Sequence, residues 1–261
     1  MRSLDPSHIE QFICRGFVKL ENAFPREVAE EALAILWRDT GCNPNEPLTW
    51  TRPVIRLGQY RDAPFMIAAN SPRLTGALDL LVGPERWSPL GSVGTFPVRF
   101  PSHEDPGDTG WHVDASFDFE QKDFMQWRVN VFSRGRALLM LFLFSDVGDQ
   151  DAPTRIRSGS HREIARMLTS AGRAGMTLRE LAQNGFDETA HCAEIHATGE
   201  AGTVYLCHPF LVHAAQTHRG TRPRFVAQPP LLPAQPLLLD REHGSYSPVE
   251  TAIREAILSR R

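Results

Sequence analysis

Trp111-His112-Val113-Asp114 is the stretch on which the prediction of both fold and site depends. It follows a loop rich in Gly, Pro and Asp at residues 101–110, so we expect a β-strand at residues 111–117. Residues i and i+2 of a strand point to the same face, which places the imidazole of His112 beside the carboxylate of Asp114. With one more imidazole, they would form the open site of two histidines and one carboxylate that suits non-haem iron(II).

Pairs of this kind also arise by chance. His8 and Glu10 follow Asp5-Pro6, which predicts the start of a helix, and residues i and i+2 of a helix do not face each other. In the pair of His161 and Glu163, Glu163 stands three residues after Ser160, where the pattern predicts a capping box at the start of another helix. Of these three pairs, His112 and Asp114 alone have a strand-like setting.

The length and composition are those of an ordinary globular chain. The 261 residues are 41% hydrophobic and 23% charged. A chain of this length can bury a full core, and we expect one domain over residues 1–261. Residues 1–90 are expected to be mainly helical support, residues 91–230 a β-rich core, and residues 231–261 a C-terminal extension with a helix.

Charge and cysteine usage exclude several classes of partner and compartment. A net charge of −3 and a pI near 6.4 give no reason to expect nucleic acid or an anionic membrane as a partner. The four cysteines show no Cys-x-x-Cys spacing, no apolar run approaches about 18 residues, and the start resembles no signal peptide. We therefore expect a soluble, cytoplasmic protein with reduced cysteines. The sequence does not indicate an oligomeric state.

Helix signals and short apolar runs predict the order of elements. Helices are expected at residues 5–14, 25–41, 71–83, 160–170 and 177–184 and from residue 247 onward, with a proline-rich loop between the second and the third. An early strand is expected at 16–20. Nine further short strands favour a double sheet, and these are expected at 93–100, 111–117, 127–132, 137–145, 152–157, 192–197, 203–207, 210–215 and 224–228.

Three histidines could supply the second imidazole. His213 is preferred because it ends an apolar run and is followed by Ala214 and Ala215, which leave room for a small molecule. His208 precedes a proline, which suggests a strand end, and His218 stands where a turn is expected. A lone histidine in a β-rich segment is more often a hydrogen-bonded structural residue than a metal ligand.

An arginine beyond this histidine could bind an anion. If the chain reverses near Arg219-Gly220, a hairpin would bring Arg224 opposite residues 213–215. A guanidinium there could hold a carboxylate through two hydrogen bonds, although an arginine after a turn is usually solvated.

Residues 117–136 combine aromatic and cationic side chains. Trp127 and Arg136 are the residues that we expect to shape a substrate pocket for an organic acid or a conjugate. The alternative is that residues 127–132, which alternate between polar and apolar side chains, form an ordinary strand.

The motifs together resemble the phytanoyl-CoA dioxygenase family of iron(II)- and 2-oxoglutarate-dependent oxygenases. The resemblance covers roughly residues 90–230 and rests on Trp111 to Asp114, on the run that ends in Gly159-Ser160-His161, and on His208 to His213 through Arg224. It implies a mainly β fold with supporting helices, in which the core is a double-stranded β-helix (jelly roll, cupin-like). It further implies that His112, Asp114 and His213 hold Fe(II), and that Arg224 binds the distal carboxylate of 2-oxoglutarate.

The implied reaction uses 2-oxoglutarate and O2, hydroxylates a small organic substrate, and releases succinate and CO2. Asp114 is present where halogenating relatives carry a small residue, which favours hydroxylation. Ala214, Ala215 and His218 stand where family members often carry Gly, Ser and Asn, so the residues that complete the cosubstrate pocket are not predicted. The alternative is a non-catalytic metal-binding cupin-like sensor or binding module. A zinc hydrolase is disfavoured because no further carboxylate presents itself as a general base.

Overall fold

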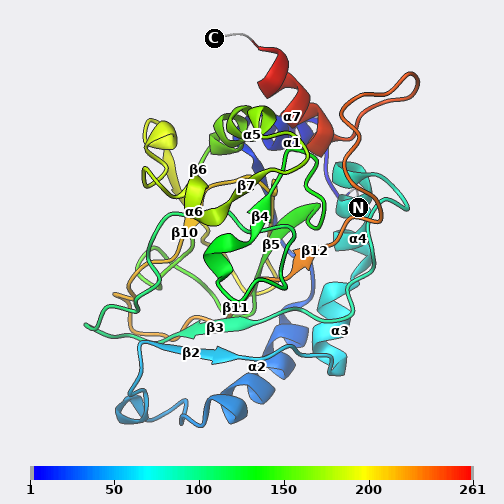
Figure 1. Ribbon diagram of the computed structural model, residues 1–261. Helices are drawn as coiled ribbons and strands as arrows, with labels where there is room; N and C mark the ends of the chain where they lie inside the picture. The colour runs from blue at the N-terminus through cyan, green and yellow to red at the C-terminus, as the bar shows by residue number, and fades with distance from the viewer. Residues whose placement is uncertain (1–2, 260–261) are drawn as a thin grey trace.

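The computed structural model describes residues 3–259, so residues 1–2 and 260–261, at the ends of the predicted domain, lie outside the described part. Its helices begin where capping residues and prolines predict them: Asp5, Ser71 and Ser247 each accept a backbone N–H, and each precedes a proline in the first turn. The helices shown in Figure 1 are α1 (Pro6–Arg15), α2 (Arg26–Thr40), α3 (Ala63–Ala69), α4 (Pro72–Val82), α5 (Ser160–Ser170), α6 (Leu178–Leu181) and α7 (Pro248–Leu258), with short 3-10 turns η1 (Pro47–Thr49), η2 (Phe124–Gln126) and η3 (Asp187–Thr189).

The strands are short, and every strand pair in the described residues is antiparallel. They are β1 (Phe17–Leu20), β2 (Val54–Leu57), β3 (Phe96–Arg99), β4 (Arg128–Val129), β5 (Leu138–Leu143), β6 (Arg155–Arg157), β7 (Met176–Thr177), β8 (Glu194–His196), β9 (Val204–Cys207), β10 (His213–Ala214), β11 (Val226–Ala227) and β12 (Pro230–Leu231). The prediction of many short strands with supporting helices is thus confirmed.

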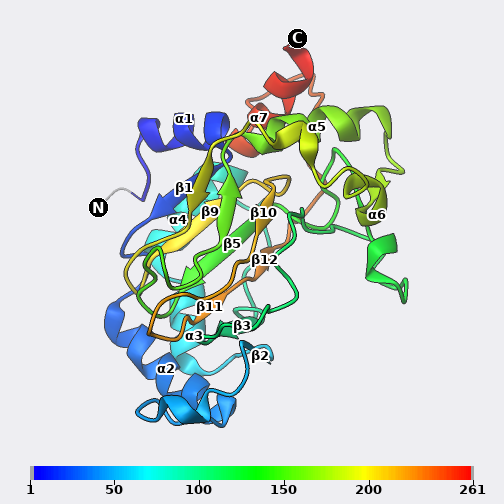
Figure 2. The ribbon, with the colours of Figure 1, turned by 90° about the vertical axis from the view of Figure 1, so that its left-hand side faces the viewer.

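Two sheets frame the interior. The larger has the order β1-β9-β5-β11, with β12 also paired to β5, and the smaller has the order β10-β6-β8. Figure 2 shows β1, β9 and β5 side by side, with α1, α5 and α7 together at one end of the molecule. Two single backbone pairs extend the sheets: Arg99 of β3 pairs with Arg224 just before β11, and His112 pairs with His213 of β10.

The larger sheet is buried on both faces, which explains the continuous apolar run of β5. One face packs on the helices through Met140, Phe142 and other members of the main core. The opposite face, with Leu139 and Leu141, forms a second cluster that also contains Ile156 of the smaller sheet. This second cluster therefore fills the space between the two sheets.

Three local predictions were wrong. Residues 111–117 form no continuous strand, because His112 pairs with His213 whereas Phe117 pairs with Arg128, so the chain leaves one partner for another. Residues 42–70, predicted as loop, contain β2 and α3, which depend on tertiary packing such as that of Phe65 against Phe96. No capping box forms at α5: its N-cap is Gly159, and Ser160 Oγ instead accepts the N–H of Val212 at 2.9 Å.

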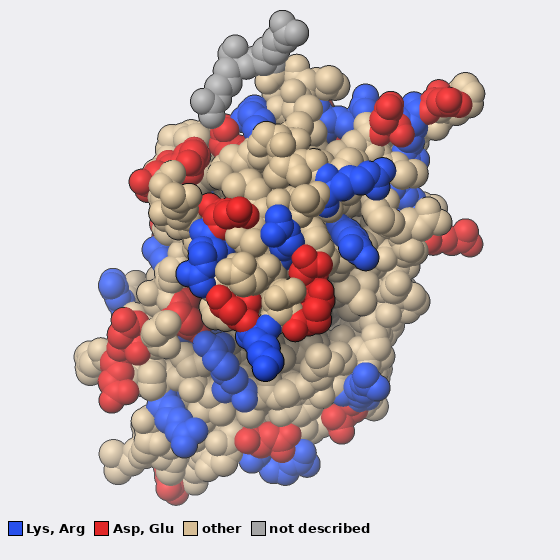
Figure 3. Space-filling view, viewed as in Figure 1, with Lys and Arg blue, Asp and Glu red and all other residues tan. Residues whose placement is uncertain are grey.

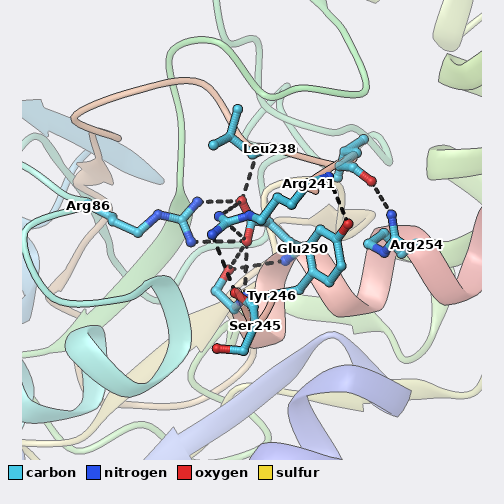
Figure 4. Close-up of polar contacts among 9 residues, drawn as sticks. Arg86, Leu238, Arg241, Ser245, Tyr246, Glu250 and Arg254 are labelled. Carbon is cyan, nitrogen blue, oxygen red and sulfur yellow. Dashed lines mark hydrogen bonds and ion pairs between the residues drawn. The ribbon is translucent and has the colours of Figure 1, made fainter. Parts of the chain in front are cut away.

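The C-terminal segment is fastened by a buried carboxylate. Glu250 of α7 is fully buried and pairs with Arg86 and Arg241, as Figure 4 shows. Its oxygens also accept the backbone N–H groups of Leu238 at 2.8 Å and Ser247 at 3.0 Å. One side chain thereby joins α7, the segment before it and the loop after α4.

Charged side chains of both signs are mixed on the surface of the protein. On the face drawn in Figure 3, acidic and basic side chains are interspersed, and neither sign gathers into one patch. None of the helices within residues 3–259 combines the length and the apolar character that crossing a membrane requires.

We predict an acid-dependent loss of stability through Glu250. Burial would raise its pKa, but Arg86, Arg241 and the two backbone N–H groups outweigh burial and lower it to about 2. A carboxyl with a lowered pKa in the folded state stabilises the fold above its unfolded pKa of 4.5. The free energy of unfolding should therefore fall by roughly 3 kcal/mol as the pH falls from 5 to about 2, as measured by urea unfolding.

The matched variants are Glu250→Gln and Glu255→Gln, since Glu255 lies exposed on the same helix. Glu250→Gln should lower the stability at pH 7 by on the order of 3 kcal/mol and remove this part of the pH dependence, because two arginines lose their partner. Glu255→Gln should do neither. Equal stability of the two variants at pH 7 would contradict the assigned role.

Candidate metal centre and its cavity

His112 and His213 face each other as a hydrogen-bonded antiparallel pair. The N–H of His112 donates to the carbonyl of His213 at 2.9 Å, and the N–H of His213 donates back at 3.0 Å. Cross-strand partners carry their side chains on the same face, and the two ring centroids lie 4.3 Å apart. Two imidazoles that are remote in the sequence are thus brought side by side by the backbone.

Both rings leave the same nitrogen free. Nδ1 of His112 lies 3.0 Å from the carbonyl oxygen of Gly110, and Nδ1 of His213 lies 3.0 Å from that of Leu211. A carbonyl only accepts, so in each ring Nδ1 carries a hydrogen, and Nε2 is the nitrogen whose lone pair the neutral ring offers to a metal. Burial, reinforced by His112, lowers the pKa of His213 to about 4, so this ring is neutral at pH 7 and able to bind a metal.

Asp114 completes the cluster with an oxygen. One ligand atom from each of His112, Asp114 and His213 can be chosen so that all three lie within 4.8 Å of one another. Burial would raise the pKa of Asp114, but Arg136 and the two histidines outweigh burial and hold it below its usual value. Two imidazole nitrogens and one carboxylate oxygen are a donor set that fits iron(II).

Arg136 forms an ion pair with the carboxylate of Asp114. Its Nη1 lies 3.1 Å from Oδ2 of Asp114, and its Nε donates to the carbonyl of Ala115 at 3.4 Å. Gly135 makes this approach possible, because a Cβ there would lie 1.8 Å from the carbonyl oxygen of Ser116. The glycine lets the turn at residues 133–136 pack directly on the backbone that carries Asp114.

A cavity of about 330 Å³ opens beside the cluster. The structure brings both predicted pocket residues, Trp127 and Arg136, to its wall, together with His112 and Asp114. Trp111 also lines it, held by the guanidinium groups of two residues of β6, whose Cζ atoms lie 4.5 and 4.3 Å from its ring centroid. In the sequence Trp111 is only the first residue of the metal-binding motif, and no signal there indicated that its ring lines the cavity.

The predicted hairpin between residues 213 and 224 is wrong. Arg224 exchanges backbone hydrogen bonds with Arg99, at 2.8 and 3.0 Å, because β10 belongs to the smaller sheet and β11 to the larger one. The chain therefore crosses between sheets where we expected a turn. Side chains alternate along the second segment, and Phe225 packs on the main core whereas Val226 faces the other sheet. Arg224 shares the face of Val226 and so points between the sheets.

The Arg224 guanidinium is almost fully buried but has no ionic partner. It donates to the carbonyl oxygens of Ala152 at 2.6 Å and Pro97 at 3.3 Å, while its Nε has no partner. No ion pair involves it within residues 3–259, whereas the neighbouring Arg99 pairs with Asp108 at 2.8 Å. Burial and Arg99 lower the pKa of Arg224 to about 9, so it stays charged at pH 7. A buried, uncompensated cation is costly, which makes this position suited to an anion.

The other histidines considered for the second ligand have structural contacts. His208 is buried, and its Nε2 lies 3.3 Å from the carbonyl oxygen of Val249 in α7. His218 is held in its own turn, with Nε2 2.7 Å from the carbonyl oxygen of Arg222. Neither belongs to the cluster.

Comparisons with known proteins agree with this geometry. A family model described as Phytanoyl-CoA dioxygenase (PhyH) matches residues 81–226. No curated protein matches the chain.

Several solved structures share the fold at low sequence identity. HygX from Streptomyces hygroscopicus, with nickel and 2-oxoglutarate bound, has a TM-score of 0.55 and 16% identity over 86% of this chain and 85% of its own. EctD from S. alaskensis, with 2-oxoglutarate and 5-hydroxyectoine, has a TM-score of 0.54 and 21% identity over 88% and 76%. SnoN, a non-heme alpha ketoglutarate dependent epimerase from nogalamycin biosynthesis, has a TM-score of 0.52 and 16% identity over 88% and 84%.

We predict that each of His112→Ala, Asp114→Ala and His213→Ala weakens binding of cobalt(II), a spectroscopic substitute for iron, by at least about 100-fold. Isothermal titration calorimetry of the metal-free protein measures this. His103→Ala is the matched control, because His103 is exposed in the preceding loop and lies outside the cluster. Unchanged affinity in the three ligand variants would rule out this metal site.

Proposed function

The chain belongs to the phytanoyl-CoA dioxygenase family, and on that basis we propose that it is an iron(II)- and 2-oxoglutarate-dependent oxygenase that hydroxylates a small organic substrate. The observation that carries the proposal is the cluster of His112, Asp114 and His213 beside an open cavity. A metal ion held by three protein ligands has coordination positions left for reactants, whereas a closed structural site has none.

We propose that the β-rich core is a double-stranded β-helix within one domain. The strand order supports this fold: β5, β9 and β11 lie in the larger sheet, which the Arg99–Arg224 pair extends to β3, whereas β6, β8 and β10 lie in the smaller one, which the His112–His213 pair extends to His112. Along the chain the segments pass repeatedly from one sheet to the other, as the two interleaved sheets of a jelly roll require.

We propose one role for each of two polar features, the cluster of two histidines and a carboxylate and the buried arginine. His112, Asp114 and His213 hold iron(II), with Nε2 of each histidine as the donor atom. Arg224 binds the distal carboxylate of 2-oxoglutarate, because its buried charge lacks an ionic partner in the described residues and a guanidinium matches a carboxylate.

Bound iron(II), with 2-oxoglutarate and O2, supplies the oxidising chemistry and yields succinate and CO2. The protein holds the metal-binding side chains in their orientations. The carbonyls of Gly110 and Leu211 fix the orientation of the two imidazoles, and Arg136 fixes that of the Asp114 carboxylate. The apolar cavity wall would exclude water from the reacting groups once a substrate fills the cavity.

Hydroxylation is the proposed outcome within a family fold that serves several chemistries. The similar structures include an epimerase by name and a complex with 5-hydroxyectoine. The carboxylate of Asp114 fills the third protein position, where a halogenating enzyme would need space for a halide. A non-catalytic metal-binding module is the second candidate, and it would bind the metal without consuming 2-oxoglutarate.

We predict that the metal-free protein, titrated without O2 with iron(II) and then with 2-oxoglutarate, develops a visible charge-transfer band only after both additions. Arg224→Gln should weaken 2-oxoglutarate binding at least about tenfold, because the carboxylate loses a charged partner. Arg222→Gln is the control, since Arg222 is exposed two residues away. A band that needs no 2-oxoglutarate, or equal binding by both variants, would count against the assignment.

A second prediction separates the catalyst from the binding module. With O2, iron(II) and ascorbate, the wild-type protein should form succinate from 2-oxoglutarate even without substrate, at a slow rate. His112→Ala and Asp114→Ala should form none. Wild-type protein that shows the charge-transfer band but forms no succinate would support the non-catalytic alternative.

A further inference from the structure

The cavity beside the metal centre has an apolar wall. Phe119, Phe124, Met125 and Phe186 line it together with the two tryptophans. The rings of Phe119 and Trp127 meet edge to face, with centroids 5.2 Å apart. The indole N–H of Trp127 already donates to the carbonyl of Gln121 at 2.9 Å, so this side chain has no donor left for a ligand.

The rim is apolar as well. The side chains of Phe119 and Phe124 are 52% and 58% exposed, which is unusual for large aromatic residues. Exposed aromatic surface next to a cavity is typical of a surface that a ligand covers. A molecule rich in hydroxyl groups would lose its hydrogen bonds to water here without replacement.

Among the cavity-lining residues, Arg136 is the one cation. Its Nη1 and Nε are engaged by Asp114 and Ala115, but no hydrogen bond within residues 3–259 involves its Nη2. The guanidinium can therefore bind a second anionic group while it keeps Asp114 in place.

The charges around the centre leave room for one more anion. Iron(II) and doubly charged 2-oxoglutarate cancel, as do Asp114 and Arg136, whereas Asp108 is shared between the buried Arg99 and the more exposed Arg56. Because 2-oxoglutarate brings only two negative charges to iron(II) and the buried Arg224 together, positive charge is left over in the loaded site. An anionic substrate lowers this surplus of positive charge, whereas a cationic one would add to it.

We propose that the substrate is a compact, apolar, ring-bearing molecule with a single anionic group, a carboxylate, which Nη2 of Arg136 binds. The volume of about 330 Å³ lies at the lower end of the range of roughly 300–1,000 Å³ for ligand pockets, which limits the part that enters. The proposal rests on the proposed function, because it takes the cluster as the metal centre, and it adds the chemical class of the substrate.

The test uses three probes that differ only in their polar end: 3-phenylpropanoate, 3-phenylpropanamide and 3-phenylpropan-1-amine. Calorimetry without O2 measures their binding to wild-type protein loaded with iron(II) and 2-oxoglutarate. The carboxylate should bind at least about tenfold more tightly than the amide, and the amine most weakly. Any other order, or no binding by any probe at 10 mM, which is about an upper limit for useful calorimetry, overturns the proposal.

Two variants assign the preference to one residue. Arg136→Gln should reduce the preference for the carboxylate over the amide to less than about threefold. Arg134→Gln should leave it unchanged, because Arg134 is exposed and lies outside the cavity wall. A preference that survives Arg136→Gln overturns the proposal. If that variant does not fold, the order of the probes on wild-type protein decides.

The charge-transfer band, recorded on the same samples, keeps the two proposals apart. Absence of the band in wild-type protein is a failure of the proposed function alone. The three probes are then compared on the metal-free protein, where the carboxylate should still bind best because Arg136 is present. Equal binding of carboxylate and amide there overturns the anionic substrate class independently.

Discussion

The pairing of His112 with His213 is the contact on which the site depends. Two backbone hydrogen bonds join residues that lie far apart in the chain, and they join the segment after β3 to the edge of the smaller sheet. Without this pair, the two imidazoles would have no fixed relation to each other. Because β10 in turn pairs with β6, the centre is tied to the strand whose arginines hold Trp111 at the cavity wall. The candidate metal centre and the cavity are therefore parts of one sheet edge.

Charge is placed in this interior at a cost to stability. Arg224, Arg99 and Arg136 all have side chains that are mostly buried, and within residues 3–259 only the last two have carboxylate partners. Placing a cation away from water without a partner is unfavourable unless a ligand restores the balance. These buried arginines thus show a common feature of functional sites, in which stability is lost in favour of binding charged reactants.

The sequence predicted the centre better than it predicted the backbone around it. His112 and Asp114 could be found because their spacing is local, and His213 because it ends an apolar run. The strand at 111–117 and the hairpin before Arg224 were wrong because strand pairing is decided by distant partners, in these cases His213, Arg128 and Arg99. β2 and α3 were missed for a similar reason: segments of four and seven residues are too short to be stable alone, and tertiary contacts such as that of Phe65 with Phe96 are recorded by no local pattern.

Gly135 shows how little sequence change could redirect such a site. A side chain at this position would collide with the carbonyl of Ser116, so any substitution moves the turn that carries Arg136. The aromatic side chains of the cavity wall would stay in place, while the arginine that lines the cavity and pairs with Asp114 shifted or withdrew. In evolution or in engineering, the range of accepted molecules could therefore change through a residue that touches neither metal nor ligand. Position 135 would be a natural first choice for a library that searches for new substrates.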